Sequence, residues 1–123
     1  MSNSVLKIWG REFELNVVFE CYPGEDVLES QREALENLCN SSVIDETLSY
    51  VKEYVKYTAG SQVSLPIDNI FKYVMPKSIF VPHNKKSSKI AIMCNYKFDA
   101  EHGIAIVFED GEYKEIGIQD IIL

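Results

Sequence analysis

Alternating apolar and polar side chains mark the first well-defined segment of the chain. Between residues 13 and 21 every odd-numbered position is apolar, whereas most even-numbered positions are polar. This period of two predicts a β-strand with one buried face. Residues 6–9 predict a preceding strand, with Gly10 and Arg11 as the reversal between the two strands.

The spacing of apolar residues then changes to a helical period after Tyr22, Pro23 and Gly24. Acidic residues occupy one side of the first predicted helix, at Glu29, Glu33 and Glu36. The other side comprises Val27, Leu28, Gln31, Ala34, Leu35, Leu38 and Cys39. We therefore expect an amphipathic helix that ends near residues 40 and 41.

A second helix is predicted to extend to about residue 58. Ser42 and Asp45 predict a weak capping box at its start. Helical spacing then continues through Ile44, Leu48, Val51 and Val55. A short third helix is expected over residues 67–74, started by Asp68 and stopped by Pro76.

The remaining segments predict two hairpins. Residues 78–81 and 89–96 indicate two strands joined by a polar loop at 83–88, and residues 104–108 and 113–117 indicate two more. Asp110 and Gly111 form the turn of the second hairpin. With a plain two-residue turn the apolar faces of its two strands do not match, and a one-residue bulge would bring them into register. The apolar residues 121–123 predict a C-terminus packed into the core, because loose termini are usually polar.

These elements predict an α+β domain with a mainly antiparallel sheet of about six strands, two long helices and one short helix. Their expected order is ββααα followed by ββββ. The length of 123 residues fits a single domain, residues 1–123. A hydrophobic content of 46% with 25% charged residues indicates a globular chain rather than a disordered or membrane chain.

The N-terminal residues and the cysteines indicate the cellular compartment in which we expect the protein. The N-terminal residues lack an apolar signal segment, so we expect a cytoplasmic protein with no membrane partner. The cysteines, Cys21, Cys39 and Cys94, are odd in number and far apart, which favours buried free thiols over a disulfide or zinc site.

Charge is segregated along the chain, whose net charge is −7. Residues 20–53 contain nine acidic residues, residues 72–97 contain six lysines and no acidic residue, and residues 99–120 contain seven acidic residues. The acidic excess disfavours direct nucleic-acid binding and favours a basic protein partner.

The best candidate for metal binding or catalysis is the group Asp99, Glu101 and His102. In an extended segment His102 would point away from the two carboxylates, so a polar turn is the favoured interpretation. A nucleophilic arrangement of Cys94 with His102 and Asp99 is a weaker alternative, because Cys94 lies in an apolar run that would raise its thiol pKa. We expect no cofactor.

Two surfaces are candidates for partner binding. Tyr50, Tyr54 and Tyr57 share one side of the second predicted helix, where they either cover the sheet edge or anchor a partner. Glu29, Glu33 and Glu36 form an acidic row that is either a solvated face or a steering surface for a basic protein.

The C-terminal quarter resembles an uncharacterised family of small bacterial cytoplasmic proteins. The resemblance is carried by Asp99-x-Glu101-His102-Gly103, by Asp110-Gly111 and by Ile116-Gly117-x-Gln119-Asp120. Gln31 and Ala34-Leu35 resemble the same family. The resemblance implies an immunity protein of a contact-dependent growth-inhibition or polymorphic toxin system. Tight turns alone also explain the Glu101-His102-Gly103 and Gly117-x-Gln119-Asp120 positions.

The leading hypothesis is therefore an immunity protein that binds a cognate toxin, expected to be a basic nuclease, by steric and electrostatic occlusion rather than by chemistry. The alternatives are a small metal-dependent hydrolytic enzyme that uses Asp99, Glu101 and His102, and a cytoplasmic adaptor. The sequence leaves the toxin, the contact surface and the oligomeric state open.

Overall fold

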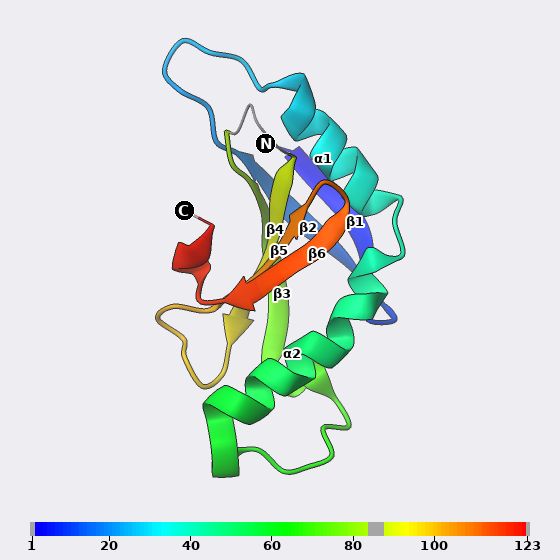
Figure 1. Ribbon diagram of the computed structural model, residues 1–123, viewed down its shortest axis with the longest axis vertical. Helices are drawn as coiled ribbons and strands as arrows, with labels where there is room; N and C mark the ends of the chain where they lie inside the picture. Colours follow the sequence, from blue (N-terminus) through cyan, green and yellow to red (C-terminus); the bar gives the residue numbers. More distant parts are fainter. Residues whose placement is uncertain (1, 84–87, 123) are drawn as a thin grey trace.

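The computed structural model, which describes residues 2–83 and 88–122, contains one six-stranded sheet and two α-helices (Figure 1). The strands lie side by side in chain order. Their bounds are β1 Ser2–Ile8, β2 Arg11–Phe19, β3 Val74–Val81, β4 Lys89–Tyr96, β5 Ile104–Glu109 and β6 Glu112–Gly117. The helices are α1 Glu29–Cys39 and α2 Val43–Ala59.

The sheet is mixed: the expected antiparallel arrangement is confirmed for four of its five strand pairings and is wrong for one. Strands β2 and β3 pair in parallel, whereas the other four pairings are antiparallel. The reason is the long connection through α1 and α2, which returns the chain to the same end of the sheet before β3 begins. Both helices lie on one side of the sheet (Figure 1).

The predicted third helix is wrong. Its place is taken by a single 3₁₀ turn, Ile70–Lys72, in which the Asn69 side chain accepts a hydrogen bond from Phe71 N at 3.1 Å. Pro76 does not stop a helix; it lies within β3, where the register with β4 shifts between Pro76 and Ser78. Such an irregular position suits proline, because proline has no N–H group to donate.

The main core lies between the helices and the sheet. It includes Leu15 and Val17 of β2, as the alternation in that segment predicts, together with Val51 and Val55 of α2. A smaller cluster lies on the opposite face of the sheet and includes Ala105, Val107 and Ile122. Because β5 is covered on both faces, its residues 104–108 are all buried.

The two tight reversals follow the sequence closely. Trp9 and Gly10 form the β1–β2 turn with positive φ angles of 49° and 86°, one residue earlier than predicted. The β5–β6 hairpin turns at Asp110 and Gly111, and its register shifts next to Val107 and Phe108, which confirms the predicted bulge.

Two predictions extend beyond the described part of the chain. The polar loop at 83–88 includes residues 84–87, and the apolar C-terminus includes Leu123; these residues lie outside the described ranges. Ile122 is described and is 8% exposed, in agreement with a packed C-terminus. No helix in the described residues is long and apolar enough to cross a membrane.

Candidate functional site

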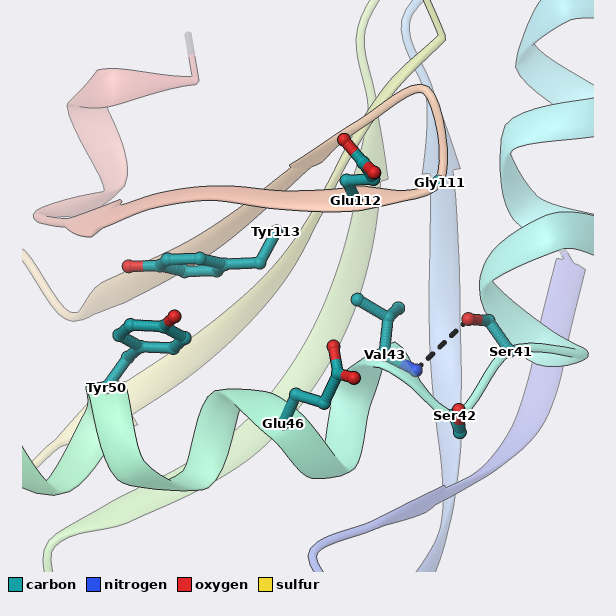
Figure 2. Close-up of a pocket in the computed structure, with 8 residues that line it drawn as sticks. All are labelled: Ser41, Ser42, Val43, Glu46, Tyr50, Gly111, Glu112 and Tyr113. Atoms are coloured by element: carbon teal, nitrogen blue, oxygen red, sulfur yellow. Dashed lines mark hydrogen bonds between the residues drawn. The ribbon is translucent and has the colours of Figure 1, made fainter.

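A cleft of about 390 Å³ separates the start of α2 from the β5–β6 hairpin. Figure 2 shows its walls, which come from the α1–α2 connection, the first two turns of α2 and the hairpin turn. They comprise Ser41, Ser42, Val43, Glu46, Tyr50, Gly111, Glu112 and Tyr113. We call this space the Tyr50–Tyr113 cleft.

The floor of the cleft is the connection between the two helices. Ser41 Oγ accepts a hydrogen bond of 3.0 Å from Val43 N, which is the dashed line in Figure 2. Ser42 is the N-cap residue of α2, but its side chain makes no capping hydrogen bond, so the predicted capping box of Ser42 and Asp45 is wrong. Ser41 therefore satisfies a backbone donor at the helix start in place of Ser42.

Two stacked tyrosine rings form one end of the cleft. The ring of Tyr50 in α2 lies 4.3 Å from the ring of Tyr113 in β6, with an angle of 10° between their planes (Figure 2). Burial, followed by the proximity of Tyr50 and of the Glu115 carboxylate, raises the pKa of the Tyr113 phenol. Both rings thus offer aromatic surface at the cleft.

The charged groups of the cleft are carboxylates. Glu46 extends from α2 toward the hairpin, and Glu112 lies on the hairpin itself (Figure 2). Both residues are exposed, and neither has a cationic partner at ion-pair distance within the described residues. Carboxylates beside aromatic rings are suited to bind a basic side chain, since arginine pairs with the first and stacks on the second.

The acidic row of α1 is a second negatively charged surface. Glu29, Glu33 and Glu36 are all exposed, and none forms an ion pair in the part of the chain that the structure describes. The opposite side of α1 is buried through Gln31, Ala34 and Leu38, as the helical period predicts. Cys39, expected on the buried side, is exposed at the helix end.

The three tyrosines of α2 have different environments. Tyr50 stacks on Tyr113, and the ring of Tyr54 packs against Tyr96 at 5.9 Å. Tyr57, in contrast, is 88% exposed in the last turn of α2. That end of the helix lies far from α1 (Figure 1), and of the three tyrosines only Tyr50 lines the cleft that Glu46 and Glu112 also line.

Asp99, Glu101 and His102 do not form a common ligand set. His102 Nδ1 lies 3.0 Å from Asp99 Oδ1, which also accepts a hydrogen bond from His102 N at 3.2 Å. These contacts raise the pKa of His102 and lower that of Asp99. Among the described residues, no group of three His, Cys, Asp or Glu side chains could hold a metal ion.

Cys94 is unsuited to the nucleophilic arrangement. Its side chain is fully buried in the main core, and burial raises its thiol pKa far above the usual value. Asp99 and His102 are solvent-accessible and pair with each other. The structure therefore separates the thiol from its proposed base.

The C-terminal residues that carry the family resemblance form a tight structural junction. Gly103, with a φ of 60°, lies against the Gln119 side chain and the Cys94 carbonyl. Gln119 N donates to His102 O at 3.1 Å, and Gln119 Nε2 donates to Cys94 O at 3.2 Å. These contacts account for the presence of glycine at position 103 and glutamine at position 119 by backbone geometry alone.

Sequence reasoning missed most of the cleft. Glu46, Glu112 and Tyr113 belong to two elements that are remote in sequence, and they meet only because α2 packs over β6. The sequence offered one indication of the cleft: the apolar faces of the two strands in the second hairpin do not match without a bulge. That bulge, beside Phe108, determines which face of the sheet Tyr113 occupies.

Comparison with known proteins gives a family for the whole chain. No curated protein and no solved structure matches it significantly. The profile of the domain of unknown function DUF6985 matches residues 1–123. The chain therefore belongs to the DUF6985 family.

Proposed function

We propose that this protein is an immunity protein that binds and neutralises a cognate bacterial toxin, and that the toxin is a basic nuclease. The observation that carries the proposal is the exposed acidic row Glu29, Glu33 and Glu36, whose carboxylates have no cationic partner in the described residues. A chain with a net charge of −7 would be attracted to the positive cleft of a nuclease.

The mechanism would be occlusion. The acidic row would accelerate association, and the Tyr50–Tyr113 cleft would accept a basic side chain of the toxin beside the Glu46 carboxylate and the stacked tyrosine rings. A buried arginine held by carboxylates and aromatic rings is a common anchor of tight protein interfaces. Covering the active site of the toxin would then prevent substrate access without any chemical step.

The test is calorimetry against an inactivated form of the protein encoded immediately upstream, at low and at moderate salt. We expect nanomolar affinity that weakens as salt screens the charges. In stopped-flow kinetics, the variant Glu33→Lys with Glu36→Lys should associate about 10-fold more slowly and show a flatter salt dependence.

A matched control is Glu12→Lys with Glu14→Lys, which makes the same charge change at two exposed residues of β2. This control should associate far faster than the α1 variant. Equal slowing in both variants would show that net charge alone sets the association rate, and it would contradict a place for the acidic row in the interface. Absence of binding to the upstream protein would contradict the immunity function and favour an adaptor with a partner encoded elsewhere.

A further inference from the structure

A second hollow, of about 490 Å³, lies where β3 begins and β4 ends. Phe71, Lys72, Tyr73 and Met75 line it from the 3₁₀ turn and the start of β3, and Asn95 and Lys97 line it from the end of β4. We call it the lysine-lined hollow. It borders the β4–β5 connection, at the lower left of Figure 1, whereas α1 lies at the upper right.

The walls of the hollow are held by hydrogen bonds between its two sides. Lys97 N donates to Tyr73 O at 2.8 Å, which joins the end of β4 to the residue before β3. Met75 and Asn95 are direct partners in the β3–β4 register. Both lysines lie in turns next to the strands, and these turns are tied to the paired ends of β3 and β4.

Positive charge gathers at the hollow in an otherwise acidic protein. Lys72 and Lys97 are exposed, and neither has a carboxylate at ion-pair distance within the described residues. The Lys97 ammonium lies 5.8 Å from the Tyr73 ring centroid, and the Arg11 guanidinium lies 4.3 Å from that of Phe71. Cations without carboxylate partners are available to an anionic ligand.

The rings beside these cations are fixed by other rings. Tyr73 stacks on Phe98 with a centroid distance of 5.5 Å, and Phe71 packs against Trp9 at 5.7 Å. Met75 is 37% exposed, and the Asn95 side chain is also exposed. The hollow thus combines apolar and aromatic surface with one amide that can both donate and accept hydrogen bonds.

We propose that the lysine-lined hollow binds a small anion that carries an aromatic ring, with a phosphate or carboxylate group at Lys72 and Lys97. The ring of the ligand would lie against Tyr73 and Met75, where stacking and apolar contact contribute to affinity. Asn95 would hydrogen-bond the polar edge of that ring. This site is separate from the acidic surface and does not depend on the neutralising function.

The test is an NMR titration of the full chain with three probes: adenosine monophosphate, 4-hydroxybenzoate and inorganic phosphate. The Asn95 side-chain amide lines the hollow, and the indole of Trp9, the only tryptophan in the chain, reports on it indirectly through its ring contact with Phe71. We expect at least one of the two ring-bearing anions to shift both signals at about 10-fold lower concentration than phosphate does. The first two probes distinguish a phosphate source from a carboxylate source.

Substitution separates specific binding from general charge attraction. Lys72→Met and Lys97→Met should each weaken binding of the ring-bearing anion about 10-fold, since a hydrogen bond to a charged group contributes roughly that factor. Lys7→Met makes the same charge change at an exposed residue of β1 and should leave binding unchanged. Asn95→Asp places a carboxylate in the hollow and should abolish binding.

Three outcomes would overturn the proposal. The first is absence of shifts with both ring-bearing anions at millimolar concentration, and the second is equal affinity for phosphate, which would remove the role of the ring. The third is an equal loss of affinity in Lys7→Met and in Lys97→Met, which would show attraction to the overall charge and not to the hollow.

Discussion

The side-chain amide of Gln119 donates a hydrogen bond of 3.2 Å to the backbone carbonyl of Cys94, directly beside the backbone of Gly103. This contact joins the turn after β6 to the end of β4, and a second hydrogen bond from Gln119 N to His102 O holds the β4–β5 connection. The first contact leaves no space for a side chain, because a Cβ at position 103 would lie 2.5 Å from Gln119 Nε2 and 2.6 Å from Cys94 O.

Gly103→Ala should therefore be strongly destabilising. The φ of 60° already disfavours alanine, and the Cys94 carbonyl is backbone that cannot move away cheaply. We expect a loss of about 3 kcal/mol in the free energy of unfolding, measured by urea denaturation. Gly24→Ala is the control, because Gly24 has a φ of 81° but no neighbour within 4 Å; its loss should be only about 1 kcal/mol. Equal losses in both variants would contradict the steric argument.

Gln31→Leu should also destabilise the fold, through lost hydrogen bonds. Gln31 is 2% exposed; its Nε2 donates to Glu20 O at 2.8 Å and to Val81 O at 3.1 Å, and its Oε1 accepts from Leu28 N at 2.8 Å. Loss of these bonds should cost about 2 to 3 kcal/mol in urea denaturation.

Gln62→Leu provides the comparison for Gln31→Leu. Gln62 is exposed and makes one long bond of 3.4 Å to Ala59 O. Its replacement should change the free energy of unfolding by less than about 0.5 kcal/mol. A similarly small effect of Gln31→Leu would show that other groups or water satisfy the three backbone groups.

The stacked pair Tyr50 and Tyr113 should show measurable energetic coupling. A double-mutant cycle with Tyr50→Ala and Tyr113→Ala should give about 1 kcal/mol in the free energy of unfolding, since the rings lie face to face at 4.3 Å. The cycle with Tyr57→Ala and Tyr113→Ala should give a coupling near zero, because Tyr57 is 88% exposed. Equal coupling in the two cycles would exclude the stack as its source.

The Asp99–His102 pair should give a defined pH dependence. The raised pKa of His102 means that its contribution to stability is complete below its usual pKa of 6.5 and is lost as pH rises through the folded value. The lowered pKa of Asp99 means that its contribution is complete above 3.8 and is lost as pH falls through the folded value. The pair should therefore stabilise the fold most between these two limits.

NMR titration of the His102 ring tests this pair. Asp99→Asn should lower the pKa of His102 toward its usual value, because Asp99 supplies both the hydrogen bond and the largest electrostatic contribution. Asp120→Asn should lower it less, since Asp120 acts only through its charge and contributes least. A larger effect of Asp120→Asn would contradict the observed pairing.

Local pattern was sufficient for most of the elements. The alternation around Leu15 and Val17 predicted a strand with one buried face, and the helical period predicted which side of α1 is acidic. Gln31 was placed on the buried side of that helix by spacing alone. These predictions succeed because the burial of a side chain within one strand or helix follows directly from its geometric period.

Pro76 shows where local pattern misleads. A proline after apolar residues at helical spacing indicates a helix stop, yet the same residues form a 3₁₀ turn and an irregular strand. The pairing of β3 with β2 and β4 decides the outcome, since it satisfies the backbone groups that an isolated segment would satisfy in a helix.

What the sequence by itself determined is thus the class of elements, the acidic face of α1, the bulge in the β5–β6 hairpin and the packed C-terminus at Ile122. Only the tertiary structure decided the parallel pairing of β2 with β3, the Tyr50–Tyr113 cleft and the lysine-lined hollow. The reason is physical: periodicity records how one element meets the core, whereas a site between elements depends on residues far apart in the chain that no local spacing relates.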